Sequence, residues 1–302
     1  MAERVGAHMP TIRTGRRVPR RAAQTTALGV AASALLAIGC AGSANRTARA
    51  TVVAVTPVAA SGSPRATATA SGEASPSARR SIVAISAGHG GPRNIGAAHH
   101  DRAGNVDLVE KDLNLDIARR LDVLLRSDGY DTVMIRDCDC SVAPDGGAQT
   151  TEQIRAESQA RADIANAHHA DVLVVIHHDG SEDPLISGTS VYYDPDRTFG
   201  DQSRRLAQSL HDELIKSISA FPYVDADRGV LNDAPIGQRY GETHTFLFGE
   251  SAGFRATEMP AALGEALFVT NDTEAGLLQL EAMKQRIAIG YRDGIEAYLA
   301  NR

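Results

Sequence analysis

Apolar residues between positions 81 and 300 alternate between short strand-like runs and longer stretches with helical spacing. The first run, SIVAIS (81–86), is rich in β-branched residues and is followed by AGHGG, a pattern typical of a buried strand. From Glu110 the spacing changes to one face of a helix, and Gly129 stands where a glycine ends many helices. The apolar positions of this face are Leu113, Ile117, Leu121, Leu124 and Leu125. The pattern therefore predicts a strand followed by a helix.

The same alternation continues through the rest of this body. Further strands are predicted at 130–137, 170–178, 188–194 and 261–269, and further helices at 150–169, 202–218 and 272–300. The patterns Thr150-x-x-Gln153 and Asn271-x-x-Glu274 predict N-terminal caps for the first and last of these helices. Strands separated by helices need crossover connections. The order therefore predicts an α/β fold: a single domain with a twisted, largely parallel or mixed sheet and helices on both faces.

The first 80 residues follow a different pattern. Five arginines between positions 13 and 21 precede the apolar run 27–39, which is followed by Cys40, and this order predicts a signal peptide over 1–40. LAIGCAGS resembles a bacterial lipobox, so Cys40 is a candidate lipidation site and lipid anchor in the membrane. The alternative is an unlipidated signal peptide with an incidental cysteine. Residues 41–80 contain no aromatic, Leu, Ile or Met residue, which predicts a disordered linker ahead of a catalytic domain at 81–302. We therefore expect an exported, extracytoplasmic protein.

Charge divides the chain at the same point. Residues 1–80 hold 11 Lys/Arg and 2 Asp/Glu, whereas the remainder holds 20 and 35. Nucleic-acid binding needs clustered Lys and Arg, so the acidic body argues against a nucleic-acid partner.

Two cysteines remain, Cys138 and Cys140. A pair separated by one residue on an extended segment is poorly placed for a mutual disulfide. We therefore expect two free, buried thiols at the end of a strand.

Several side chains with metal-binding chemistry lie at or near the ends of predicted strands. His89 follows the first strand, His177 and His178 end the 170–178 strand, and Glu265 lies in the last. Sites in open parallel sheets gather beyond the carboxyl ends of the strands. Together with Glu110, two imidazoles and an open fourth position would form a hydrolytic zinc site. Taken singly, each residue also fits a hydrogen-bonded loop or a solvated helix start. Alternation along the strand puts His177 and His178 on opposite faces and leaves open which one faces the site.

Four ordered motifs over about 81–299 carry a resemblance to a known family. They are SAGHGG, EKDLNLDIARRL, the stretch from Arg161 to ADVLVVIHHDG, and MPAALGEALFVTN. In these motifs the chain resembles the zinc-dependent N-acetylmuramoyl-L-alanine amidases. The resemblance implies a Zn²⁺ cofactor and cleavage of the amide between muramic acid and the peptide stem of bacterial peptidoglycan.

The resemblance also implies roles for individual residues. The zinc ligands would be His89, Glu110 and His177, and Glu265 would be the catalytic base. Asp179 is a candidate either to orient a ligand or to contact the substrate. Asn271 is a candidate substrate contact, and His178 is left to form local hydrogen bonds.

Some features depart from the family pattern. Gly264 replaces an aliphatic residue, and Leu267 stands where glycine is frequent. The segment 228–258 is longer than expected, which allows a groove-shaping loop, an autoinhibitory cover or a tolerated insertion. The alternative functions are another zinc amidohydrolase or peptidase acting on cell-wall peptides, and a catalytically silent wall-binding lipoprotein. Activation by a partner protein stays open.

Overall fold

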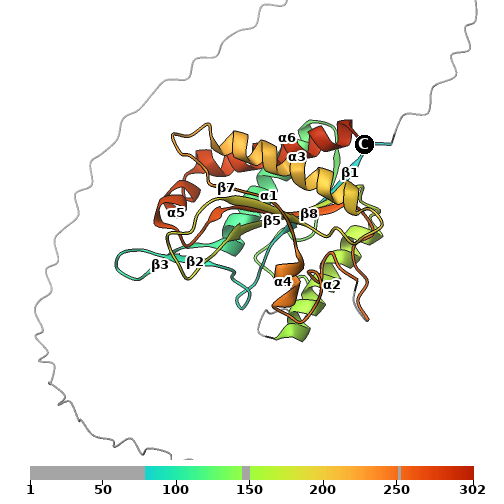
Figure 1. Ribbon diagram of the computed structural model, residues 1–302, viewed down its shortest axis with the longest axis horizontal. Coiled ribbons are helices and arrows are strands. Elements are labelled where there is room, and N and C mark those ends of the chain that lie inside the picture. The colour runs from blue at the N-terminus through green and yellow to red at the C-terminus, as the bar shows by residue number, and fades with distance from the viewer. Residues whose placement is uncertain (1–78, 145–149, 251–252) are drawn as a thin grey trace, which may run out of the picture. The chain divides into compact units, whose positions relative to one another are not determined.

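A six-stranded sheet forms the centre of the computed structural model, which describes residues 79–144, 150–250 and 253–302 (Figure 1). The strand order is β4-β1-β5-β8-β6-β7. The first four strands in this order are mutually parallel, whereas β6 and β7 run antiparallel to them through the β6–β8 pair. The bounds are β1 (Ile82–Ala87), β4 (Asp131–Met134), β5 (Val172–Asp179), β6 (Thr189–Tyr193), β7 (Asp227–Asn232) and β8 (Ala261–Phe268).

Helices cover both faces of this sheet. The larger core packs α1 (Glu110–Ser127), α3 (Gly200–Ile218) and α6 (Glu281–Ala300) against one face. The second core packs α2 (Thr151–Ala167) and the segment 246–259 against the other. In β5, Val172, Val174 and Ile176 belong to the first core, while Leu173 and Val175 belong to the second. This alternation explains the unbroken apolar run. The predicted single α/β domain with a mixed, mostly parallel sheet is confirmed.

The structure also contains elements that the sequence pattern did not predict. A short hairpin of β2 (Ala98–His100) and β3 (Val106–Val109) precedes α1, and the short helix α4 (Ala234–Gln238) follows β7. The β7 sequence, DRGVLN, is polar and contains a glycine, and it forms an edge strand. Edge strands need no apolar face on both sides, so their sequence signal is weak.

The last predicted helix is broken in two. Asn271 caps α5 (Asp272–Leu278) by accepting from the Thr273 and Glu274 N–H groups, as expected. The chain then leaves helical geometry at Leu280, where ψ is 126°, before α6 begins. Leu278 and Met283, on either side of the break, are both fully buried in the larger core. Tertiary packing therefore overrides a continuous helical pattern here.

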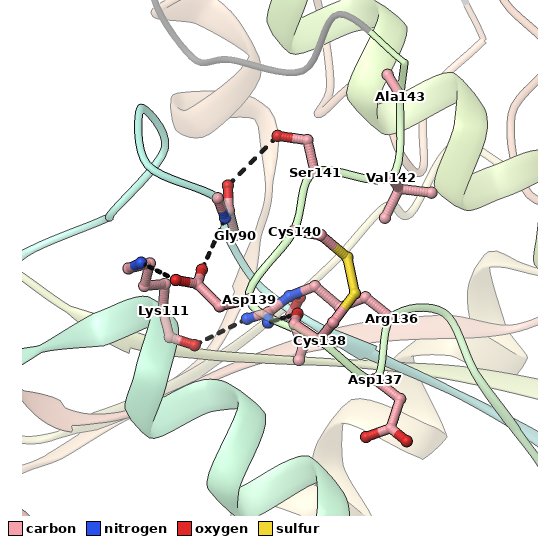
Figure 2. Close-up of a disulfide and its surroundings, with 12 residues drawn as sticks. Gly90, Lys111, Arg136, Asp137, Cys138, Asp139, Cys140, Ser141, Val142 and Ala143 are labelled. Atoms are coloured by element: carbon pink, nitrogen blue, oxygen red, sulfur yellow. Dashed lines mark hydrogen bonds and ion pairs between the residues drawn. A yellow bond between two sulfur atoms is a disulfide. The ribbon is translucent and has the colours of Figure 1, made fainter.

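The prediction of free thiols was wrong: Cys138 and Cys140 form a disulfide (Figure 2). The strand β4 ends at Met134, and the backbone bends over residues 137–140 instead of staying extended. The two Cα atoms lie 5.3 Å apart, within the usual range for a disulfide, whereas two residues of extended chain span about 6.6 Å. The bend brings Asp139, between the cysteines, to the Gly91 N–H at 2.8 Å. The disulfide loop thus packs against the loop that follows β1.

The predicted signal peptide over 1–40, with Cys40, and nearly all of the predicted 41–80 linker lie outside the described residues. Among the helices of the described ranges, none has the length and apolar character needed to cross a membrane.

Candidate metal centre

The loop after β1 presents His89 toward the end of β5. The Gly88 N–H donates to the Ile176 carbonyl, which holds the loop against β5. A Cβ atom on Gly88 would lie 2.3 Å from His177 Nε2, so only glycine lets the imidazole of His177 lie there. His89 itself adopts a φ of 60°, a left-handed conformation that costs non-glycine residues about 1–2 kcal/mol. The strain indicates that surrounding contacts hold this loop in place.

Two buried arginines provide those contacts. Arg161, from α2, donates to the carbonyl oxygens of Ala87 (2.7 Å) and His89 (2.6 Å). Arg136 donates to the Gly88 carbonyl at 2.8 Å. Both guanidinium groups thereby hold the backbone of the loop that follows β1.

His89, Glu110 and His177 converge at this end of the sheet. Glu110 Oε1 lies 2.9 Å from His177 Nδ1 and 3.1 Å from His89 Nε2. The two imidazole rings are edge to face, with centroids 4.7 Å apart. One potential ligand atom from each of the three residues lies within 4.8 Å of the others. Residues that are 88 positions apart in the chain therefore form one cluster.

Polar neighbours orient Glu110 and His89. Glu110 Oε2 accepts the Ala97 N–H at 2.8 Å, and Asn114 Nδ2 donates to Oε1 at 3.2 Å. The Nδ1–H of His89 donates to Asn94 Oδ1 at 2.6 Å, which leaves Nε2 of the ring facing Glu110. Sequence reasoning missed both asparagines. Asn114 had a signal, since it lies four residues after Glu110 on the same helix face, whereas Asn94 had none.

The strand periodicity left the choice between His177 and His178 open, and the structure makes it. His177 lies on the α2 side of β5 and joins the cluster. His178 lies on the α1 side, is 1% exposed, and its Nδ1–H donates to Asn114 Oδ1 at 2.8 Å. Burial lowers the pKa of His178 to about 3, so this ring is neutral. His178 thus contacts the cluster through Asn114 and through its own backbone N–H, which donates to Glu110 Oε1 at 3.3 Å.

The electrostatics of the cluster favour an ionised Glu110. Burial disfavours a charged Glu110, but His89 and His177 outweigh it and hold the pKa of the carboxyl well below its usual value. Burial lowers the pKa of His177. Burial also opposes a charged His89, yet Glu110 outweighs it and raises the pKa of His89. A charged carboxylate beside two imidazoles in a buried site is the arrangement that a cation stabilises.

These donors fit Zn²⁺ in type and spacing. Zinc takes His nitrogen and Glu oxygen at about 2.0–2.2 Å, which puts the ligand atoms of a tetrahedral site about 3.3 Å from one another. The distances of 2.9 and 3.1 Å from Glu110 Oε1 are close to that spacing. Gly96 makes room for the cluster: at φ +72°, a Cβ there would lie 2.3 Å from Glu110 Oε2.

Glu265 lies beside the cluster on the neighbouring parallel strand. It is directly in register with His177, so the two side chains leave the sheet on the same face. Glu265 Oε2 is buried and has no hydrogen-bond partner among the described residues. Burial, followed by the charges of Glu110 and Asp179, raises the pKa of Glu265 well above its usual value. A buried carboxyl without a partner is available for proton transfer.

A bulge in β8 follows Glu265, where the register with β5 shifts. Leu267 has a φ of 69° in this bulge, a left-handed conformation that glycine adopts at less cost. Gly264 has a different cause: a Cβ would lie 2.3 Å from the Tyr291 hydroxyl. Both departures from the family pattern therefore concern the backbone around Glu265 rather than its carboxyl group.

The other two predicted site residues lie close to the same sheet edge. Asp179 ends β5 and accepts the Gly180 N–H at 2.8 Å, and burial raises the pKa of its carboxyl. Asn271 caps α5 and its Nδ2 donates to the Pro184 carbonyl at 2.8 Å. Helix capping accounts for Asn271 without a ligand. Substrate contact by either residue stays a prediction.

A cavity of about 230 Å³ adjoins the cluster, lined by His89 and His177. The long segment 228–258 supplies one wall through Ile236, Tyr240 and 245–247. Two of its acidic residues pair with arginines instead: Glu242 pairs with Arg155 of α2 at 2.5 Å, and Glu250 lies 3.6 Å from Arg197. Of the three interpretations of this segment, its position favours the groove-shaping one.

Comparison with known proteins agrees with this site. A family model described as N-acetylmuramoyl-L-alanine amidase (Amidase_3) matches residues 83–297. The Bacillus subtilis protein YqiI, described as uncharacterized, is 31% identical over 216 residues, which cover 72% of this chain and 84% of YqiI. The N-acetylmuramoyl-L-alanine amidase AmiA of Escherichia coli is 26% identical over 257 residues, 76% of this chain and 81% of AmiA.

Solved structures show the same fold. The catalytic domain of CwlV, an N-acetylmuramoyl-L-alanine amidase from Bacillus (Paenibacillus) polymyxa var. colistinus, is 26% identical with a TM-score of 0.52, covering 74% of this chain and 99% of that one. The CwlD amidase of Clostridioides difficile, solved with the GerS lipoprotein, is 24% identical with a TM-score of 0.58, covering 74% and 100%. Because the family model spans most of the chain and the four motifs fold around one site, this protein belongs to the N-acetylmuramoyl-L-alanine amidase family.

Proposed function

We propose that the protein is a zinc-dependent hydrolase that cleaves the amide between N-acetylmuramic acid and L-alanine in peptidoglycan. The observation that carries this proposal is the pairing of two features at one sheet edge. His89, Glu110 and His177 form a compact ligand set, and Glu265 stands in register with His177 as a buried carboxyl without a partner. A protein that only binds the cell wall would have no use for the Glu265 carboxyl beside the three metal ligands.

Zinc bound by His89, Glu110 and His177 would supply a Lewis acid that polarises the amide carbonyl and acidifies water. Glu265 accepts the proton of the attacking water and passes it to the leaving nitrogen. Asn94 holds the ring of His89 through Nδ1. Asp179, at the end of β5, would contact the substrate on the side of Glu265.

The groove beside the ligands suits the substrate class. Its wall includes Phe246 and Leu247, and Tyr240 lies at the same cavity. The lactyl group of muramic acid and the side chain of L-alanine both carry a methyl group, which an apolar wall can accept.

The proposal extends to delivery of the enzyme. Residues 1–40 act as a signal peptide, Cys40 carries a lipid that anchors the protein to a bacterial membrane, and 41–80 form a tether to the catalytic domain at 81–302. The Cys138–Cys140 disulfide supports export, because disulfides persist mainly in oxidising compartments.

The test is to incubate purified protein with purified peptidoglycan and to identify the amino groups that appear. Cleavage of the proposed bond creates N-terminal L-alanine, and we expect it to stop with chelator and return with Zn²⁺. The inactive comparison is His89→Ala, which removes one zinc ligand and should abolish the release of L-alanine amino groups.

The alternatives predict other products. A cell-wall peptidase would expose amino groups within or at the far end of the stem, with no free L-alanine amine. A silent wall-binding protein would sediment with peptidoglycan and release nothing at any zinc concentration. Either result would overturn the proposed activity.

A further inference from the structure

A second cluster of potential ligands lies where the loop after β6 meets the long segment 228–258. Asp194 follows β6, Asp233 follows β7, and His244 follows α4. All three are buried, with exposed fractions of 3%, 0% and 8%. One potential ligand atom from each lies within 4.8 Å of the others.

The contacts of His244 with the two aspartates leave one carboxylate oxygen without a hydrogen bond. His244 Nδ1 lies 2.6 Å from Asp233 Oδ1 and 3.3 Å from Asp194 Oδ1. A single N–H can donate well to only one of these oxygens. Asp194 Oδ2 is buried and has no hydrogen-bond partner among the described residues. A buried carboxylate oxygen in this position costs free energy unless a cation or donor reaches it.

Arg197, which lines the same cavity, forms its hydrogen bonds with other groups. The guanidinium of Arg197 donates to the carbonyl oxygens of Phe248 and Thr257, and its closest carboxylate is Glu250 at 3.6 Å. Two buried carboxylates therefore share one imidazole, and the cluster carries excess negative charge.

The Nε2 atom of His244 makes the contact that the non-ligating nitrogen of a metal-binding histidine usually makes. His244 Nε2 lies 3.1 Å from Asp196 Oδ2 and can donate its proton to that carboxylate. Metal-binding histidines usually donate their second ring N–H to a carboxylate or carbonyl, which fixes the tautomer that offers the other nitrogen. Here that arrangement leaves Nδ1 free to bind an ion between Asp194 and Asp233.

We propose that Asp194, Asp233 and His244 bind a second divalent transition-metal ion, separate from the site at His89. One imidazole with two carboxylates suits Zn²⁺ better than Ca²⁺, which takes oxygen ligands. A cavity of about 270 Å³, lined by Asp194, Asp196 and His244, gives the ion a route in.

The ion would hold the groove wall in place. Asp233 Oδ2 accepts the Thr245 N–H at 2.8 Å, and the residues after it, Phe246 and Leu247, line the cavity beside the first metal centre. The second ion therefore ties the loop after β6 to the segment that shapes the groove. Its role is structural and does not depend on the proposed reaction.

The test is metal stoichiometry of the purified full chain, stripped with chelator, titrated with Zn²⁺ and measured by elemental analysis after dialysis. We expect two equivalents in the wild type and one each in His89→Ala and Asp194→Asn. The double variant should bind none. Glu250→Gln, which removes an acid 80% exposed at the rim, is the matched control and should keep two.

Asp196→Asn tests the second site without disturbing folding, because the Asp196 side chain is 78% exposed. It should keep two equivalents but weaken the second by about 10–100-fold. A single equivalent in the wild type, lost in His89→Ala, would overturn the proposal. A second equivalent of zinc that survives Asp194→Asn would also overturn it, since that ion would then be bound elsewhere. A site that binds Ca²⁺ and not Zn²⁺ would overturn it as well.

Discussion

Replacing Glu265 with glutamine separates catalysis from stability. The amide keeps the shape of the side chain but cannot accept a proton. Loss of a positioned general base typically lowers the rate about 10²–10⁴-fold, or about 3–5 kcal/mol of transition-state stabilisation. We therefore expect Glu265→Gln to lose turnover by this factor while its zinc content stays at the wild-type level, because Glu265 is not a ligand.

The same structure predicts little or no cost in folding. Glu265 Oε2 has no hydrogen-bond partner among the described residues, and the Glu110 and Asp179 charges disfavour a charged carboxylate there. Removing the charge from the metal-free protein should leave its free energy of unfolding unchanged or increase it.

Glu274, in α5, offers a matched control. Its carboxylate is fully buried and accepts from the Phe268 N–H (2.6 Å), the Gly188 N–H (2.9 Å) and the Tyr223 hydroxyl. Glu274→Gln replaces one accepting oxygen with a donor, and one lost bond to a charged group costs about 1.5–3 kcal/mol. This variant should be less stable, with full zinc content.

The assays are release of L-alanine amino groups, zinc content, and urea denaturation of the metal-free forms. Three outcomes would refute the reasoning about Glu265. These are turnover within tenfold of wild type, loss of zinc in parallel with activity, or a destabilisation as large as that of Glu274→Gln.

Three further predictions concern other parts of the fold. Gly96→Ala should weaken zinc binding about 10–100-fold in a chelator competition, because its Cβ would lie 2.3 Å from Glu110 Oε2; unchanged affinity would show that the loop yields. Burial, then the charge of Glu274, raises the pKa of Asp225 from 3.8 to about 6, so the folded state loses stability as the pH rises through this range. Asp225→Asn should therefore gain about 1 kcal/mol at pH 8, after allowance for solvent screening, and nothing at pH 4, and equal gains at both would contradict this. Finally, the peptide that contains Cys138 and Cys140 should be lighter by two hydrogens before reduction in mass spectrometry, and an unchanged mass would rule out the disulfide.

Local patterns determined most of the architecture. The apolar run of β5, the single face of α1 and the cap of α5 each depend on residues within a few positions of one another. Strand–helix alternation then restricts the topology, because parallel strands need crossovers. The convergence of His89, Glu110 and the end of β5 follows from the same rule, and the resemblance selected His177.

Contacts between distant segments decided the rest. Whether His177 or His178 faces the site depends on which helix covers each face of a strand that is apolar on both. The Cys138–Cys140 disulfide depends on a backbone bend, and the Asp194–Asp233–His244 cluster joins segments up to 50 residues apart. Periodicity reports which side chains are buried, whereas their partners are set by how whole elements pack. That packing energy is spread over the chain and has no local signature in the sequence.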